Sequence, residues 1–189
     1  VKLHVCENTP HLIMNLLLAG SLEVGVISRE EPAPGLTCEP FITEQLFLAG
    51  APHHRLKLDR PVSASRLAEL PLVQAVRPSA VRTLLARFAS EKGLTFNYNV
   101  EVDSIHLMID VAASGHSFTA LPYSAIREQV RAGRICAAPL THLSIDWAIA
   151  RPVERQISLA SRRFGESLRA VAKKEVDSGQ WLTARYREG

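Results

Sequence analysis

The sequence of 189 residues predicts an α/β protein, because two stretches each have the pattern of a strand, a helix and a second strand. The clearer stretch is Val100–Pro122, in which two valines alternate with a glutamate over residues 100–102. Apolar residues then recur at helical spacing in Ile105–Ala112, and Gly115 is placed to end this helix before a second apolar run. Ligands tend to bind beyond the carboxyl ends of such parallel strands. A small-molecule site is therefore expected around residues 103–104, where the helix begins.

The opening stretch of the chain has the same pattern. Leu and Val alternate with polar residues in Lys2–Cys6, which predicts a short strand. Thr9 is placed as the N-cap of a helix, Pro10 suits its first position, and Gly20 is placed to end it. Leu22–Ile27 then predicts another strand. The helix N-terminus again follows the end of a strand.

The rest of the chain continues to alternate strands and helices. Leu36–Ala49 is expected to form a bent or two-part strand, and the polar tail Gln180–Gly189 carries no clear pattern. The helix Ala80–Lys92 is expected to bury Val81, Leu84, Leu85 and Phe88. The other predicted helices are Ser63–Leu70, Ser124–Ala132 and a long one capped by Ser158, and the other strands are Leu72–Val76, Asn97–Val102, Ile135–Ala138 and Ile145–Ala150.

Composition restricts the classes of function. The formal charge is +3 with no run of Lys or Arg, which argues against a nucleic-acid footprint on this chain. The three cysteines are dispersed and odd in number, which favours reduced thiols and the cell interior. No signal peptide precedes Val1 and no apolar run approaches a membrane span. We expect a cytoplasmic protein.

The sequence contains no recognisable catalytic, cofactor or metal motif. It lacks GxSxG, P-loop, HExxH and GxGxxG patterns, so no catalytic residue and no cofactor are predicted. His53 and His54 are adjacent, but they have no nearby carboxylate or cysteine that would complete a metal site. An enzyme built on this fold would need a catalytic site that no motif identifies.

Five stretches, read in order, resemble one known family. They are LLLAGSLEVGVI, GLTCEPFITEQLFLAGAPHHRL, LAELPLVQAVRPSAVRTLL, VEVDSIHLMIDVAASGHSFTALPYSAI, and the long helix after IDWAIARPVERQIS. Their order and separation resemble the effector-binding domain of LysR-type transcriptional regulators, over most of residues 1 to 170. The family has a second glycine in its GlGi turn, whereas this chain has Gly115-His116-Ser117-Phe118.

The resemblance implies an N-terminally truncated periplasmic-binding-protein type 2 fold. Two Rossmann-like lobes would be joined by two crossing strands, with residues 1–47 plus 142–189 in lobe one and 48–141 in lobe two. Family members have a first strand and helix before the one at Lys2 and a winged helix-turn-helix further upstream. DNA contact would come only from that missing part, and self-association as a dimer or tetramer is implied.

The effector is expected in the cleft between the lobes, where three helix N-termini would converge at Thr9, Ser79 and Ser104. Unpaired N–H groups and the helix dipole favour an anion such as a carboxylate there, although these residues could also do no more than cap their helices. Arg77 could bind a carboxylate or instead pair with Glu101 or Asp103. The predicted effector-binding residues are Asn8, Thr9, His11, Arg29, Arg77, Ser79, Ser104 and His106.

These observations predict a regulatory domain that senses a small molecule of the carboxylate or amino-acid class and modulates DNA binding by the whole oligomer. The alternative is a solute-binding protein of the same fold that serves a transporter. A change of DNA affinity on ligand binding would separate the two.

Overall fold

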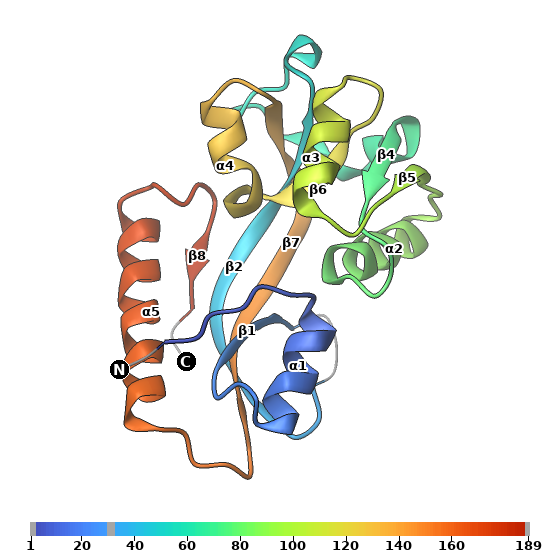
Figure 1. Cartoon of the computed structure of the whole chain (residues 1–189). Helices are drawn as coiled ribbons and strands as arrows, with labels where there is room; N and C mark the ends of the chain where they lie inside the picture. Colours follow the sequence, from blue (N-terminus) through green and yellow to red (C-terminus); the bar gives the residue numbers. More distant parts are fainter. Residues whose placement is uncertain (1–2, 30–32, 188–189) are drawn as a thin grey trace. The chain divides into compact units, whose positions relative to one another are not determined.

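The computed structural model of the chain describes residues 3–29 and 33–187 and shows a mixed α/β protein (Figure 1). The backbone divides into two compact units, Val1–Thr43 with Asp146–Gly189, and Glu44–Ile145. We call them unit 1 and unit 2 and describe each by itself. Two long strands, β2 (Leu36–Gly50) and β7 (Cys136–Pro152), contribute residues to both units.

The sheet in unit 1 adds a short strand to each of the two long ones. β1 (Gly25–Ser28) pairs antiparallel with residues 147–150 of β7. β8 (Arg185–Tyr186) pairs antiparallel with Ile42 and Thr43 of β2. The strand order is therefore β1, β7, β2, with β8 on the other side of β2.

Helix α1 (Pro10–Ala19) precedes β1, as the sequence predicts. It begins after Thr9 and ends at Gly20, whose φ of 76° lies in the left-handed region that glycine adopts without strain. Its inward residue Leu17 is fully buried. The predicted helix start and stop are both confirmed.

The strand predicted at Lys2–Cys6 is wrong over the residues that the structure describes. Leu3–Cys6 forms no ladder, and the side chains of Leu3 and Val5 are 61% and 73% exposed. The alternation was real, but no neighbouring strand takes up the backbone hydrogen bonds that a strand needs. Since β1 runs antiparallel to β7, the opening stretch is not a parallel strand–helix–strand unit.

The second half of unit 1 is α5 (Leu159–Asp177) and the tail that follows it. The hydroxyl of Ser158 accepts a hydrogen bond from the N–H of Ser161, which confirms the predicted cap. The tail then returns to the sheet, where Tyr186 packs edge-on against the ring of Phe41 at a centroid distance of 6.5 Å. The sequence pattern did not predict this segment.

Unit 2 is organised around β4 (Pro71–Gln74), which runs parallel to β5 (Asn97–Glu101). Helix α2 (Ala80–Lys92) connects these two strands, and its range is the one predicted. Helix α3 (Ile105–Ala113) connects β5 to β6 (Thr119–Pro122). The largest fully buried side chains here include Leu72, Leu85, Met108 and Ile126.

The strands on either side of α3 do not pair with each other. β4 lies between them, because Leu72 forms a parallel bridge to Phe118 while β5 occupies the other edge of β4. β6 itself pairs antiparallel with β2. The predicted strand–helix–strand order of Val100–Pro122 is present, but its parallel partner is β4.

Smaller elements complete unit 2: η1 (Pro52–His54), β3 (Val62–Ser63) parallel to β7, η2 (Ala64–Glu69), and α4 (Tyr123–Arg131). The helix predicted over Ser63–Leu70 is thus a 3-10 helix. The two strands predicted at Ile135–Ala138 and Ile145–Ala150 are one continuous strand, β7. His142, with a φ of 61°, lies between the two predicted segments without ending the strand.

Candidate functional site

Two helix N-termini leave the same edge of the parallel strand pair in unit 2. Gln74, the last residue of β4, lies opposite Glu101, the last residue of β5. The N–H of Val102 donates to the backbone carbonyl of Gln74 at 3.1 Å, so the register holds to the end of both strands. Helices α2 and α3 begin a few residues later, after Ser79 and Ser104. This is the place where an α/β sheet commonly binds ligands.

Both serines cap their helices, as predicted. The hydroxyl of Ser79 accepts from the N–H of Arg82 at 3.4 Å, and the hydroxyl of Ser104 accepts from the N–H of Leu107 at 3.3 Å. A hydroxyl that accepts a capping bond still has its own hydrogen to donate. Each serine can therefore cap its helix and bind an anion at the same time.

Arg77 lies on the loop between β4 and α2, and its side chain is exposed. The sequence left open whether it pairs with Glu101 or Asp103. Among the described residues Arg77 forms an ion pair with neither, and Glu101 pairs with Arg82 at 2.7 Å instead. The charge of Arg77 acts on the Tyr98 hydroxyl, whose pKa is raised by burial and pulled back down by Arg82 and Arg77. A cation thus remains beside the two helix N-termini.

Arg82 is the residue at this edge that sequence reasoning missed. Its side chain is buried, whereas Val81, predicted to face the core, is half-buried. The guanidinium carbon lies 3.2 Å from the centroid of the Tyr98 ring, and Nη2 lies 2.7 Å from Glu101 Oε1. An arginine within an apolar helical stripe, with an aromatic and a glutamate in the next strand, is the signal that could have found it.

The same edge exposes apolar side chains. Val76 is 40% exposed, Ile105 is 41% exposed and Leu107 is 50% exposed, and all three flank the starts of α2 and α3. His106 is also exposed in the first turn of α3. Apolar surface, a free cation and two helix N-termini therefore lie together in unit 2.

The other predicted residues belong to unit 1. Thr9 occupies the N-cap position of α1, but its hydroxyl makes no capping bond; Asn8 Oδ1 instead accepts from the Thr9 N–H at 3.2 Å. His11 is exposed on α1. Arg29 follows β1, with its N–H bonded to the carbonyl of Asp146 at 2.8 Å and its side chain exposed. The predicted side-chain cap at Thr9 is wrong, which leaves that hydroxyl uncommitted.

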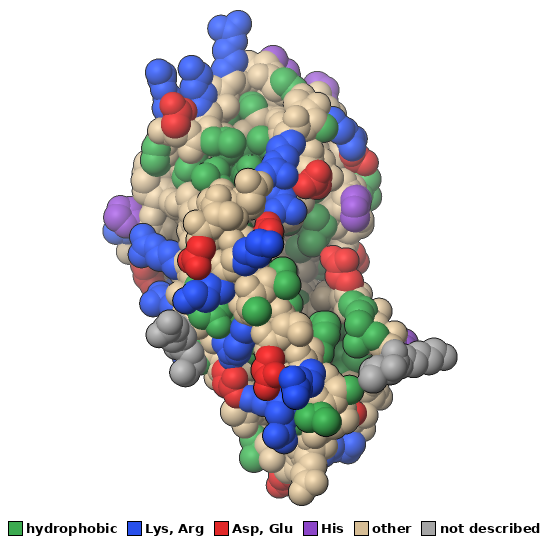
Figure 2. Space-filling view, turned by 90° about the vertical axis from the view of Figure 1, so that its left-hand side faces the viewer, with side chains coloured by type: hydrophobic (Ala, Val, Ile, Leu, Met, Phe, Trp, Pro, Cys, Tyr) green, Lys and Arg blue, Asp and Glu red, His purple; other side chains and the backbone are tan. Residues whose placement is uncertain are grey.

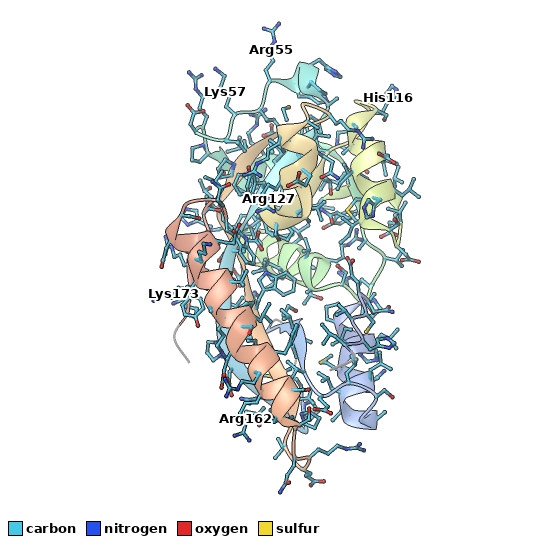
Figure 3. The ribbon with its side chains drawn as sticks, turned by 60° about the vertical axis from the view of Figure 1, so that its left-hand side comes forward. Arg55, Lys57, His116, Arg127, Arg162 and Lys173 are labelled. Carbon is cyan, nitrogen blue, oxygen red and sulfur yellow. The ribbon has the colours of Figure 1, made fainter. Side chains whose placement is uncertain are left out.

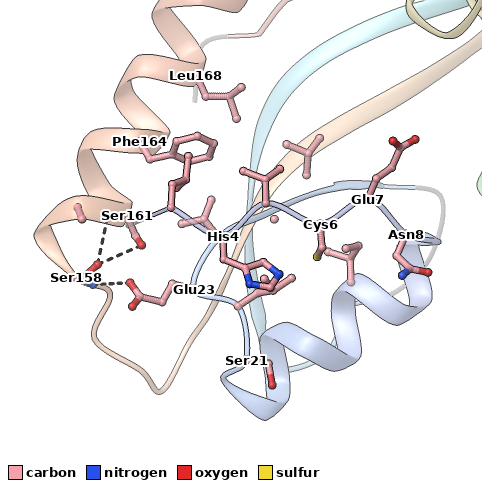
Figure 4. A pocket seen from close by; sticks show the side chains of 18 residues that line it. His4, Cys6, Glu7, Asn8, Ser21, Glu23, Ser158, Ser161, Phe164 and Leu168 are labelled. Carbon is pink, nitrogen blue, oxygen red and sulfur yellow. Dashed lines mark hydrogen bonds between the residues drawn. The ribbon is translucent and has the colours of Figure 1, made fainter. Parts of the chain in front are cut away.

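Unit 1 also contains a hollow of about 500 Å³ (Figure 4). Its walls are the Leu3–Asn8 segment, residues 21–26 and the start of α5, and of the predicted site residues it includes Asn8. Phe164 and Leu168 of α5 point into it. Most of the lining is apolar, so it offers an anion much less than the helix starts of unit 2 do.

Two helix N-termini already hold carboxylates of the chain itself. Buried Glu44 accepts from the N–H of Ser124 at 2.7 Å and from its hydroxyl at 3.0 Å, at the start of α4. Glu23 accepts from the N–H of Ser158 at 2.8 Å, at the start of α5. Hydrogen bonds from the hydroxyls of Ser161 and Ser158 hold the pKa of Glu23 below its ordinary value. Carboxylate binding at helix N-termini is thus a recurring device in this molecule.

The structure gives no sign of a metal centre in residues 3–29 and 33–187, where no group of three or more His, Cys, Asp or Glu is arranged to hold an ion. No helix in those ranges is long and apolar enough to cross a membrane. Cys6, Cys38 and Cys136 are free thiols. On the face shown in Figure 2, Lys and Arg side chains lie among Asp and Glu rather than in an area of one sign.

Comparison with known proteins decides the family. A family model described as the LysR substrate binding domain matches residues 1–173. The chain belongs to this family. The HTH-type transcriptional regulator BbuR of Bordetella bronchiseptica is 26% identical over 187 residues, which are 96% of this chain and 56% of BbuR. The nitrogen assimilation regulatory protein Nac of Klebsiella aerogenes is 29% identical over 127 residues, 67% of this chain and 41% of Nac. The chain spans about half the length of these curated relatives.

Solved structures confirm the predicted fold. The effector binding domain of QuiR in complex with shikimate gives a TM-score of 0.74 at 14% identity, covering 88% of this chain and 79% of that one. The regulatory domain of Synechocystis PCC6803 CcmR in complex with 2-PG gives 0.75 at 16% identity, covering 87% and 80%. The chain is a LysR effector-binding domain with the periplasmic-binding-protein type 2-like α/β fold.

Proposed function

We propose that this LysR-type effector-binding domain senses a small molecule that carries a carboxylate on an apolar body. The observation that carries the proposal is the edge of unit 2 where α2 and α3 begin. Two helix N-termini, the exposed cation Arg77 and three exposed apolar side chains meet there. Such a surface matches a ligand with one anionic end and one apolar face.

Two further facts support an anionic ligand. The molecule already holds the carboxylates of Glu44 and Glu23 at other helix N-termini, so the same chemistry is available at α2 and α3. The structural neighbour QuiR is in complex with shikimate, which is itself a carboxylate on a ring. Amino acids and other small carboxylates belong to the same chemical class of ligand as shikimate.

We further propose that the two units are the two lobes of the domain, with the ligand between them. Unit 1 would then contribute the start of α1, where the Thr9 hydroxyl makes no capping bond. Asn8, His11 and Arg29 would add polar groups from unit 1, as Arg77, Ser79, Ser104 and His106 would from unit 2.

In the whole regulator, the ligand would bias DNA binding by the oligomer. The physical requirement is that it binds one arrangement of the lobes more tightly than the other, since equal affinity would shift nothing. DNA would be contacted by a part of the protein outside this chain; full-length CbnR has been solved with its target DNA. The named relatives are transcriptional regulators, which favours this reading over a solute-binding protein.

A thermal-shift screen of small carboxylates, each paired with its uncharged amide, tests the proposal. A ligand at one hundred times its dissociation constant adds about 2.7 kcal/mol of stability. The carboxylate should stabilise the chain and its amide should not. A chain that responds to no carboxylate, or equally to both members of each pair, contradicts the anion site.

Arg77→Ala gives the residue-level test. A charged hydrogen bond contributes about 1.5–3 kcal/mol and exposure reduces this, so affinity for a carboxylate hit should fall on the order of tenfold. The matched control is Lys57→Ala, which removes an exposed cation that points away from the body of unit 2 (Figure 3). Equal losses for both variants would remove Arg77 from the site. Gel shifts with the full-length protein and the same ligand then test the regulatory step.

A further inference from the structure

We infer that Arg82 is a positioning residue of this site. By pairing with Glu101, it cancels a carboxylate that would otherwise repel an anionic ligand, and it ties the start of α2 to the strand that leads into α3. The inference rests on the proposed function, because it concerns the same ligand.

The geometry makes Arg82 a link between the two helix starts. Its backbone N–H donates to the hydroxyl of Ser79, the cap of α2. Its guanidinium binds Glu101 at 2.7 Å, three residues before Ser104, the cap of α3. One side chain therefore connects the two loops that carry the candidate ligand contacts. A shift of either loop would have to break this ion pair.

The charges at this edge explain why the pair affects a ligand. Glu101 is 47% exposed, so its carboxylate faces the solvent in which an anion would arrive. Its nearest cation is the buried Arg82, and Arg77 also acts on the neighbouring Tyr98. Arg77 and Arg82, set against Glu101 and the exposed Asp103, leave the edge without net charge. Without Arg82 these groups would carry one net negative charge, which would repel an anion.

Burial indicates that this arginine does more than fill space. Arg82 is 8% exposed, and Nε and Nη1 have no hydrogen-bond partner among the described residues; the guanidinium carbon lies 3.2 Å from the centroid of the Tyr98 ring. Burying a guanidinium costs free energy that an apolar side chain of similar size does not cost. The position lies within an otherwise apolar helical face, so a charge there points to a role beyond packing.

A charge cycle tests the inference: Arg82→Met, Glu101→Gln and the double variant. The 15N-labelled 189-residue chain is titrated with shikimate and with benzoate, a carboxylate on an apolar ring, and the amide shifts of the first turns of α2 and α3 are followed. Removing one nearby charge should change anion affinity on the order of threefold to tenfold. Arg82→Met should weaken binding, Glu101→Gln should strengthen it, and the double variant should recover most of the loss. High salt should shrink all of these differences.

The control cycle makes the same charge changes at Arg66 and Glu69, an exposed pair of unit 2. It should leave affinity unchanged. Glu101→Gln carries the test alone if Arg82→Met does not fold. The amide oxygen of Gln can still accept a hydrogen bond from Arg82 and hold the two helix starts together, so the variant removes only the negative charge that repels an anion. Weaker or unchanged binding by Glu101→Gln overturns the inference. Absence of shifts at both helix starts in the unmodified chain, with both probes, contradicts the proposed function itself and the inference with it.

Discussion

The two units expose apolar side chains in different ways. In unit 2, which is described throughout, three large apolar side chains are exposed, and all of them lie at the edge where α2 and α3 begin. In unit 1 the exposed ones spread over the Leu3–Cys6 segment, α1, β1, the loop after β7, and α5. They are Leu3, Val5, Leu12, Leu18, Val26, Val153, Leu159, Phe164 and Val171.

The difference distinguishes the edge that we propose as a ligand site from the more widely spread apolar surface of unit 1. Apolar surface concentrated beside Arg77 and two helix N-termini suits a small amphipathic ligand, because polar and apolar contacts are offered together. Apolar surface spread along a whole helix offers contact area without an orienting polar group. The 500 Å³ hollow of unit 1 is mostly apolar, and its polar lining includes Asn8, Glu23 and Ser158 but no Lys or Arg. We expect the two units to differ in stability as well.

The largest expected effect comes from truncating matched buried leucines. Leu85→Ala in α2 and Leu17→Ala in α1 each remove a side chain that is 0% exposed, at a typical cost of about 2–5 kcal/mol. The loss of stability should lie at the upper end of this range for Leu85→Ala. It should lie at the lower end for Leu17→Ala, because the small apolar cluster around Leu17 borders the open hollow and can relax more easily.

Urea unfolding, with hydrogen exchange to assign the loss to a unit, measures both costs. Val171→Ala, at a 60% exposed position, is the control and should stay within about 0.5 kcal/mol. A larger loss for Leu17→Ala than for Leu85→Ala would break the comparison.

The next effect separates the two carboxylates at helix N-termini. Glu44→Gln in unit 2 should cost about 1–3 kcal/mol, because it weakens two charge-assisted hydrogen bonds at a fully buried position. Glu23→Gln in unit 1 should cost little, because solvent screens an exposed carboxylate. Thermal unfolding of the two variants is the measurement. Equal losses would show that burial does not set the strength of these caps.

A smaller effect concerns the tail of unit 1. Tyr186→Ala removes an edge-on contact with Phe41 and a cation contact with Lys173 at 5.7 Å, and aromatic pairs contribute about 0.5–1.5 kcal/mol. Amide exchange should accelerate at Ile42 and Thr43, the residues opposite β8, and stay unchanged in unit 2. Arg185→Ala keeps the strand and removes an exposed side chain, so it should leave exchange unaltered. Faster exchange in both units would mean that the tail stabilises the whole chain.

The sequence predicted the elements of unit 2 better than those of unit 1, for a physical reason. α2 and α3 have local signals at both ends: a serine that caps, an apolar stripe, and a glycine at or just after the C-terminus. Lys2–Cys6 has only alternation, and whether such a segment becomes a strand depends on a partner that local sequence does not contain. The tail strand Arg185–Tyr186 shows the opposite case. It has a partner strand in β2, but two residues are too few to show an alternation of apolar and polar side chains in the sequence.

The candidate site divides in the same way. Ser79 and Ser104 could be predicted because a helix cap is a local feature. The partner of Glu101 could not, because Arg77 and Arg82 both lie close to the start of α2 and only the direction of the α2 face selects Arg82. The roles of Asn8, Thr9, His11 and Arg29 in ligand binding stay a prediction, because contacts between distant parts of the chain leave no local pattern in the sequence.

The smallest predicted effect is a difference in the pH at which each unit weakens. In unit 2, the pKa of His54 lies below its ordinary value of 6.5. Burial is the main cause and the charge of His53 the second, while a weaker hydrogen bond with the backbone of Gly115 raises the pKa. The buried Nε2 has no hydrogen-bond partner among the described residues, so protonation is unfavourable in the folded state. The unfolded chain binds the proton first. The contribution of neutral His54 to the free energy of unfolding is therefore fully present above about pH 6.5. It is lost as the pH falls from there toward the pKa of His54 in the folded state.

In unit 1, Glu23 has a lowered pKa because the Ser161 and Ser158 hydroxyls donate to its carboxylate. Its contribution is complete above the ordinary value of 4.5 and is lost as the pH falls below it. Acidification should therefore raise amide exchange in unit 2 before unit 1. His54→Gln should remove the first step, and His116→Gln, at an exposed position (Figure 3), should not. If unit 1 opens first, or if His54→Gln leaves the first step in place, the buried imidazole does not set the acid sensitivity of unit 2.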